Sequence, residues 1–279
     1  MIYMTGDCHA DFSKFSMDKF PEQREMTRDD YVIVCGDFGI WHDGEAERER
    51  LRWLAHRKFT IIFVDGNHEN FDRLYSDEFP IVNFHGAKAH RIRKNIYHIM
   101  RGEVFTLEGK KFFAFGGASS HDIQDGIMDT DKFLNPEYGK TMHQLLTSKD
   151  HMDEIELSRI YEAIHDEEFK WYYQGKTMYR VKHFSWWPEE VASEEEMIHG
   201  CDTLQANDWK VDYVISHCCP QHVASHLSRG YYKPEPMTEY FDKIAEELDF
   251  TRWYFGHYHT NKDLLDKYTV LYERIERIV

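Results

Sequence analysis

Residues Tyr31–Asp37 read Tyr-Val-Ile-Val-Cys-Gly-Asp, a continuous apolar run that ends in a glycine and an aspartate. The run is too short for a helix and rich in β-branched residues, which is typical of a strand buried on both faces. Thr60–Val64 has the same character. Between the two runs, Glu45–Lys58 is charged, with apolar residues at helical intervals. Strand, helix and strand at this spacing predict βαβ units in a parallel or mixed sheet.

Further strands are expected on both sides of this unit. They are predicted at Ile2–Met4, Val104–Leu107, Lys111–Phe115, Val211–Ile215, Trp253–Phe255 and, near the C-terminus, within Tyr268–Val279. The second and third of these flank Glu108-Gly109-Lys110, so they form a β-hairpin pattern with glycine in the turn. The chain as a whole therefore favours an α/β fold.

One long segment, residues 121–207, breaks this alternation. Its acidic stretch Asp150–Lys170 predicts a helix, and a second helix is expected to start at Ser193, with Glu196 at the capping-box position. We expect residues 1–279 to form a single domain in which residues 121–207 are an insertion or cap that selects the substrate. Repeats and low-complexity linkers are missing from the sequence.

Composition and charge narrow the class of protein. The chain has 279 residues, of which 42% are hydrophobic, so a globular fold is expected. Its net charge of −16 argues against non-specific binding to duplex nucleic acid, which needs a basic surface. A small phosphorylated ligand is still compatible, because bound metal ions create a local positive field.

The cysteines and the apolar runs indicate in which cellular compartment the protein is expected. Five cysteines, two of them adjacent at Cys218 and Cys219, offer no disulfide framework and fit a reducing compartment. Ile2–Met4 already fits a strand, which argues against a signal peptide. The apolar runs are all far shorter than the roughly 20 residues of a membrane span. We expect a cytoplasmic protein that does not bind membranes.

Five polar clusters close the predicted strands. They are Gly6-Asp7-Cys8-His9, Gly36-Asp37, Gly66-Asn67-His68-Glu69, Ser216-His217 and Gly256-His257-Tyr258-His259. In an open α/β sheet, ligands bind beyond the carboxyl ends of the strands, where all five clusters are expected. Asp7 and His9, like His257 and His259, are two residues apart, so in extended chain they project to the same side. The clusters together predict one site.

The side chains in these clusters are suited to metal ions. Carboxylate oxygen, amide oxygen and imidazole nitrogen favour Mn, Fe, Zn, Co or Ni over a metal that needs thiolates. Seven candidate ligands are too many for one metal ion that keeps an open coordination position. They fit two ions that share one carboxylate. We expect two divalent transition-metal ions, with Mn as the first expectation.

In order and kind, these clusters resemble the signature of the calcineurin-like metallophosphoesterases. That signature runs D-x-H, G-D, G-N-H-[E/D], a lone H and G-H-x-H, and the matching parts are roughly Met1–Gly117 and Val211–Asn261. The resemblance implies a fold of two packed mixed β-sheets flanked by helices. It also implies a metal-dependent phosphoric ester hydrolase, acting as a phosphatase or phosphodiesterase.

The resemblance also implies a role for each residue. A first metal is held by Asp7, His9 and His259, a second by Asn67, His217 and His257, and both by the bridging Asp37. A water activated by the two ions attacks phosphorus in line, and the ions neutralise charge on the phosphoryl oxygens. His68 is the catalytic residue, protonating the leaving oxygen or hydrogen-bonding to it.

Departures from the pattern bear on the substrate. Ser/Thr protein phosphatases usually have arginine just before G-N-H-E, where this chain has Asp65, and aspartate three residues after the bridging one, where it has Ile40. A small or nucleotide-like phosphate mono- or diester is therefore the expected substrate. The alternatives are a protein phosphatase and a non-catalytic, metal-stabilised interaction module. Asp43 and Glu69 are both candidates to orient His68.

Overall fold

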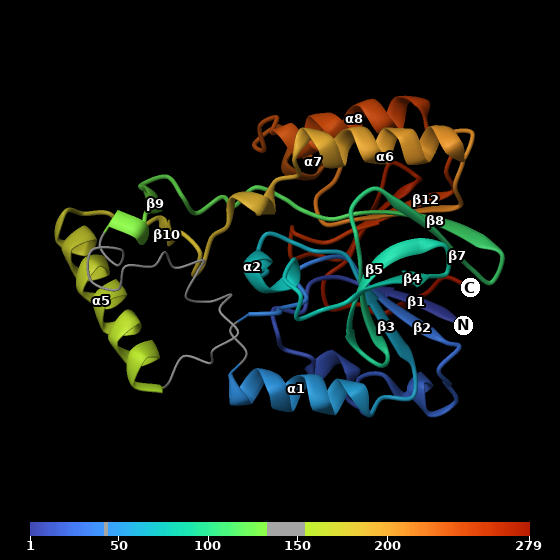
Figure 1. Ribbon diagram of the computed structural model, residues 1–279. Coiled ribbons are helices and arrows are strands. Elements are labelled where there is room, and N and C mark those ends of the chain that lie inside the picture. The colour runs from blue at the N-terminus through green and yellow to red at the C-terminus, as the bar shows by residue number, and fades with distance from the viewer. Residues whose placement is uncertain (42–43, 133–153) are drawn as a thin grey trace. The chain divides into compact units, whose positions relative to one another are not determined.

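The computed structural model describes residues 1–41, 44–132 and 154–279, and within this part the chain forms two compact units. The first unit consists of Met1–Glu69, Phe79–Ser119 and Glu189–Val279. The second consists of Asn70–Glu78 and Ser120–Pro188. Figure 1 shows the helices and strands of each unit.

The first unit contains a seven-stranded mixed sheet with the order β15-β1-β2-β3-β6-β5-β4. Its strands are β1 (Ile2–Thr5), β2 (Tyr31–Val34), β3 (Thr60–Phe63), β4 (Ile81–Phe84), β5 (Ala87–Arg93), β6 (Ile96–Ile99) and β15 (Glu276–Arg277). β1, β2, β3 and β6 run parallel, whereas β4, β5 and β15 pair antiparallel with their neighbours. The parallel centre brings the carboxyl ends of β1, β2 and β3 to one edge.

A second mixed sheet of six strands has the order β13-β14-β12-β11-β8-β7. Its strands are β7 (Glu103–Leu107), β8 (Lys110–Phe115), β11 (Tyr213–Ser216), β12 (Arg252–Phe255), β13 (Lys262–Leu264) and β14 (Tyr268–Val270). β7 and β8 form the predicted hairpin, and β8, β11, β12 and β14 are parallel. The ends of β11 and β12 therefore also lie side by side.

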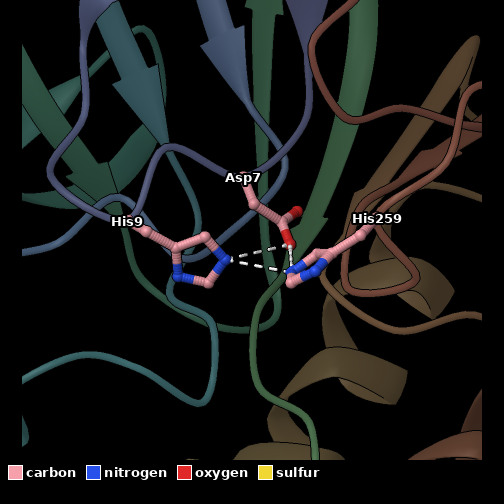
Figure 2. A group of neighbouring side chains, drawn as sticks. All are labelled: Asp7, His9 and His259. Carbon is pink, nitrogen blue, oxygen red and sulfur yellow. Dashed lines mark hydrogen bonds and ion pairs between the residues drawn. The ribbon is translucent and has the colours of Figure 1, made fainter.

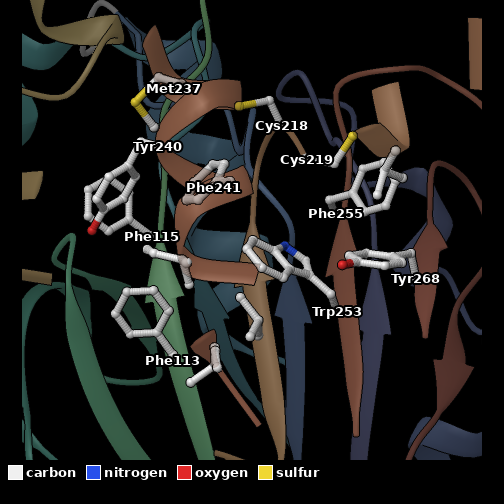
Figure 3. Close-up of a cluster of buried hydrophobic side chains, with 14 of the residues drawn as sticks. Phe113, Phe115, Cys218, Cys219, Met237, Tyr240, Phe241, Trp253, Phe255 and Tyr268 are labelled. Atoms are coloured by element: carbon white, nitrogen blue, oxygen red, sulfur yellow. The ribbon is translucent and has the colours of Figure 1, made fainter. Parts of the chain in front are cut away.

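Two hydrophobic cores hold the layers of the first unit together. Apolar side chains of both sheets, such as Ile33 and Ile62 of one and Ile215 of the other, form a shared core between them. On its other face, the second sheet packs under the helices, with Phe115 and Trp253 against Phe241 (Figure 3). The expected pair of mixed sheets flanked by helices is confirmed.

Helices cover both outer faces of the sheets in the first unit (Figure 1). They are η1 (Ser13–Phe15), η2 (Pro21–Arg24), α1 (Glu45–Ala55), α6 (Glu194–Ala206), α7 (Gln221–Ser228) and α8 (Pro236–Glu247), with the short η3 (Pro188–Glu190) at the unit boundary. α6 begins with the predicted capping box between Ser193 and Glu196. None of the described helices is both long and apolar enough to cross a membrane.

The second unit is small and has its own core. It contains α2 (Phe71–Leu74), α5 (Glu154–Tyr173) and a parallel pair of strands, β9 (Gly126–Met128) and β10 (Tyr179–Val181). Its apolar centre is formed by Met128, Ile160, Ile164 and Val181.

The insertion predicted from the sequence extends to residue 207, but the second unit ends at Pro188. Helix α6 belongs to the first unit, because Leu204 is buried in the core of that unit. Residues 150–153 of the predicted Asp150–Lys170 helix lie outside the described residues.

A buried polar network lies behind the turn that follows β3. The carboxylate of Asp65 accepts hydrogen bonds from Arg101 Nε at 2.9 Å and pairs with His98 Nε2 at 3.0 Å. His98 Nδ1 in turn lies 3.0 Å from Nδ1 of His90, and both rings are buried. Burial and the neighbouring His98 lower the pKa of His90 to about 3.

This pKa predicts an acid-sensitive stability. Between about pH 6.5 and about pH 3 the unfolded chain binds a proton at His90 that the folded protein excludes, so the free energy of unfolding falls as the pH falls. In chelator-treated protein, His90→Gln is expected to make the free energy of unfolding less dependent on pH, with a slope smaller by about 1.4 kcal/mol per pH unit near pH 5. Urea unfolding at a series of pH values measures it. The exposed His165→Gln is the control, and equal slopes in all three proteins would contradict the prediction.

Candidate metal centre

All eight sequence-predicted site residues lie just beyond the carboxyl ends of parallel strands. Asp7 and His9 follow β1, Asp37 follows β2, Asn67 and His68 follow β3, His217 follows β11, and His257 and His259 follow β12. The last three residues of each of these strands are buried, so the polar residues that follow emerge at the same edge. The turns thus bring together residues from opposite ends of the chain, such as His9 and His259, which are 250 positions apart.

Asp7, His9 and His259 form one cluster of donor atoms (Figure 2). His259 Nε2 lies 3.0 Å from His9 Nε2 and 3.2 Å from Asp7 Oδ2, and His9 Nε2 lies 3.7 Å from the same oxygen. Two ligands bonded to one ion at about 2.0–2.2 Å lie about 3.0–3.5 Å from each other. The spacing and chemistry of the three side chains therefore fit a metal ion.

A second cluster is centred on the fully buried His217. Its Nε2 lies 3.3 Å from Asp37 Oδ2 and 3.2 Å from Asn67 Oδ1. Its other ring nitrogen, Nδ1, lies 2.9 Å from the carbonyl oxygen of Cys35. A proton on Nδ1 leaves Nε2 with the lone pair that a metal needs. The ring of His257 lies beside that of His217, with 5.0 Å between the centroids.

Asp37 reaches both clusters. Its Oδ2 lies 3.7 Å from His9 Nδ1 and 3.3 Å from His217 Nε2, while its Oδ1 accepts a hydrogen bond of 2.8 Å from the backbone N–H of His68. Burial by itself raises the pKa of Asp37, but the neighbouring imidazoles of His217, His68 and His9 together outweigh it and lower the pKa overall. The carboxylate is thus kept ionised where cations are expected to bind.

The backbone is under strain at four of the candidate ligands. His9, Asp37, His257 and His259 have φ values of 46°, 45°, 65° and 46°, in the left-handed region that non-glycine residues rarely adopt. The turns are also tightly packed, since a Cβ on Gly66 would overlap the carboxylate of Asp37. Such strain is typical of functional sites, and here it aims side chains inward from the strand ends.

His68 is partly exposed and lies at the same edge. Its ring centroid is 5.5 Å from that of His9, and its carbonyl oxygen accepts a hydrogen bond of 2.9 Å from the indole N–H of Trp41. The side chain of His259 is 53% exposed, so this edge of the site is open to solvent. His68 can therefore reach a ligand that enters from solution.

Glu69 has a different role from the one considered in the sequence. Its carboxylate is fully buried and accepts hydrogen bonds from the backbone N–H groups of Phe38, Gly39 and Ile40 at 2.6–3.3 Å. It therefore anchors the loop after Asp37 instead of orienting the ring of His68. The other candidate, Asp43, lies outside the described residues.

Asp65 occupies the position where protein phosphatases carry a phosphate-binding arginine. Here the side chain is fully buried and paired with Arg101 and His98. It cannot contact a substrate. Its partners instead support the turn that carries Asn67 and His68.

The fold and the converging carboxylate, amide and imidazole groups define the class of metal-dependent phosphoric ester hydrolases. The family model described as calcineurin-like phosphoesterase matches residues 1–261, so the chain belongs to this family. The expected family and reaction class are confirmed.

Two known proteins are similar to this chain. Lariat debranching enzyme A of Xenopus laevis is 24% identical over 176 residues, which are 57% of this chain and 30% of that enzyme. The chain thus spans less than a third of that relative. The structure of phosphopantetheinyl hydrolase from Mycobacterium tuberculosis aligns with 98% of this chain and 89% of its own, at 14% identity and a TM-score of 0.35.

Proposed function

We propose that the protein is a dinuclear metallophosphoesterase with Asp37 as the bridging ligand. Asp7, His9 and His259 would hold one ion, and Asn67, His217 and His257 the other. The observation that carries this proposal is the position of the Asp37 carboxylate, within 3.7 Å of imidazole nitrogens from both clusters. When bound, two divalent ions supply an activated water and neutralise phosphoryl oxygens, and Mn²⁺ is the first candidate.

The chain itself orients the substrate and handles the proton of the leaving group. We propose His68 as the general acid, because its ring is solvent-accessible and lies next to His9. Its main chain is held on both sides, by Asp37 at the N–H and by Trp41 at the carbonyl. With its backbone held in this way, His68 can present its ring to a leaving oxygen at the open edge of the site.

A small or nucleotide-like phosphate ester is the proposed substrate. The net charge of −16 disfavours long polyanions, and Asp65 replaces the arginine of a protein phosphatase. A compact ester needs no such basic surface, because the metal centre supplies the positive field.

A direct assay tests the proposal. Mn²⁺-loaded protein is expected to hydrolyse at least one of four substrates: an aryl phosphate monoester, an aryl phosphodiester, a cyclic nucleotide and a phosphopeptide. We expect turnover of one of the first three in preference to the phosphopeptide, and loss of turnover after chelation. Turnover of the phosphopeptide alone would favour the protein-phosphatase alternative. Full activity without metal would contradict the proposed mechanism.

We propose that the second unit is an insertion in one phosphoesterase domain, because the chain enters and leaves it from the first unit at both of its segments. Replacement of residues 120–188 by a short linker tests this. The shortened protein is expected to retain its metals and change its substrate preference. Loss of the metals would make the unit part of the core.

A further inference from the structure

Lys14 is a buried lysine directly behind the loop that carries Asp7. It belongs to η1 and is only 8% exposed. Four oxygens lie within hydrogen-bonding distance of the three N–H donors on its Nζ, namely Asp7 O at 2.7 Å, Tyr272 O at 2.7 Å, Gly6 O at 3.2 Å and Thr5 Oγ1 at 3.3 Å. Within the described part of the chain, these are its hydrogen-bond partners, and none of them is a carboxylate.

Burial of this ammonium group costs free energy that an apolar side chain would not cost. A lysine at this position therefore points to a contribution that an apolar side chain cannot make. A charge removed from water needs converging polar partners, and apolar replacements of buried charges are often as stable as the original. Methionine has nearly the same length and would fill the same space. What the ammonium adds is attachment of the turn after β1 to the segment that carries Tyr272, which is 258 residues after Lys14.

These attachments close a ring of contacts around the first metal cluster. Lys14 binds the carbonyl oxygens of Asp7 and Tyr272. The ring of Tyr272 stacks on that of His259, with 4.7 Å between the centroids and 23° between the planes. His259 Nε2 then returns to Asp7 Oδ2 at 3.2 Å. The two ligands, which approach from separate segments in Figure 2, are thereby tied to one ammonium group.

We propose that Lys14 is a positioning residue for the metal held by Asp7, His9 and His259. This inference rests on the proposed dinuclear function. Lys14 acts as a built-in cation that fixes the backbone of Asp7 and, through Tyr272, the imidazole of His259. It touches neither the substrate nor the metal.

Because Lys14 is charged, the direction in which its replacement changes metal affinity distinguishes two effects. A positive charge near a divalent cation repels it, so removal of the charge alone would tighten metal binding. Loss of the backbone attachments would weaken binding, because the donor atoms of Asp7 and His259 would no longer be held at their spacing. The proposal requires the second effect to be the larger one.

Titration of metal-free protein with Mn²⁺ by calorimetry tests the proposal in Lys14→Met. Wild-type protein is expected to bind two ions, and the variant to bind one of them 10–100-fold more weakly, the usual effect of losing a residue that orients a ligand. Affinity for the other ion should change less than twofold. Lys19→Met is the matched control, because it removes an exposed charge from the same segment. Unchanged or tighter binding of both ions in Lys14→Met would overturn the proposal.

A second variant covers the case in which Lys14→Met fails to fold. Lys14→Gln keeps two N–H donors, so it is expected to fold and to show an intermediate loss of affinity for the same ion. Wild-type affinity in Lys14→Gln would overturn the role of Lys14 while leaving the dinuclear function intact. Binding of fewer than two ions by the wild-type protein would instead overturn the dinuclear function, and this inference with it.

Discussion

Asp37→Ala is expected to remove more than one metal ion per chain and to lower kcat/KM by more than about 100-fold. The reason is the position of its carboxylate, whose Oδ2 lies within 3.7 Å of His9 and 3.3 Å of His217. Loss of an outer partner of a metal ligand costs about 10–100-fold in affinity or activity, and loss of a shared ligand must cost more. Elemental analysis of the purified protein and an aryl phosphate assay measure the two effects.

The matched control is Asp18→Ala, an exposed carboxylate that lies outside the candidate ligand set. It is expected to retain both ions and full activity, which separates a bridging role from a change in net charge. Asp37→Ala should also lose the hydrogen bond from the N–H of His68, so the turn after β3 loosens together with the metals. Retention of two ions by Asp37→Ala would contradict the bridging role and leave two independent sites as the alternative.

The strands that carry the site are predictable from sequence because each is an apolar run closed by a polar cluster. Tyr31–Val34 and Thr60–Phe63 are buried along their whole length, which leaves the pattern unambiguous. The sequence pattern does not predict the antiparallel strands β4 and β5. Their sequences, Ile-Val-Asn-Phe and Ala-Lys-Ala-His-Arg-Ile-Arg, mix exposed and buried residues, because one strand lies at the sheet edge and the other next to it.

The supporting residues of the site could not be derived from sequence either. The place of Glu69 beside His68 is visible in the sequence, but its contacts with Phe38, Gly39 and Ile40 depend on how two loops meet. Lys14 resembles an ordinary helix-surface lysine until the chain folds, and its partner Tyr272 is 258 residues away. Candidate metal ligands can be identified in a sequence from their residue type. A residue that supports the site by bonding to backbone atoms can be identified only from the folded structure.

His68→Ala is expected to lower kcat by roughly 10²–10⁴-fold while both metals remain bound, because a general acid contributes about that factor. The ring of His68 lies beside that of His9, with 5.5 Å between the centroids, and the backbone N–H bond from His68 to Asp37 survives the change. Metal content should therefore match the wild-type protein. The exposed His165→Ala is the control and should leave both quantities unchanged.

The leaving group gives a sharper test of the same role. A general acid matters most when the departing oxygen is strongly basic, since such an oxygen leaves poorly without a proton. Among aryl phosphates with progressively more acidic phenols, the loss of kcat in His68→Ala should therefore shrink. A loss of the same size for every phenol would mean that His68 stabilises the phosphoryl group itself and donates no proton to the leaving oxygen. Because the two roles place the ring of His68 at different atoms of the substrate, this series decides between them without a bound structure.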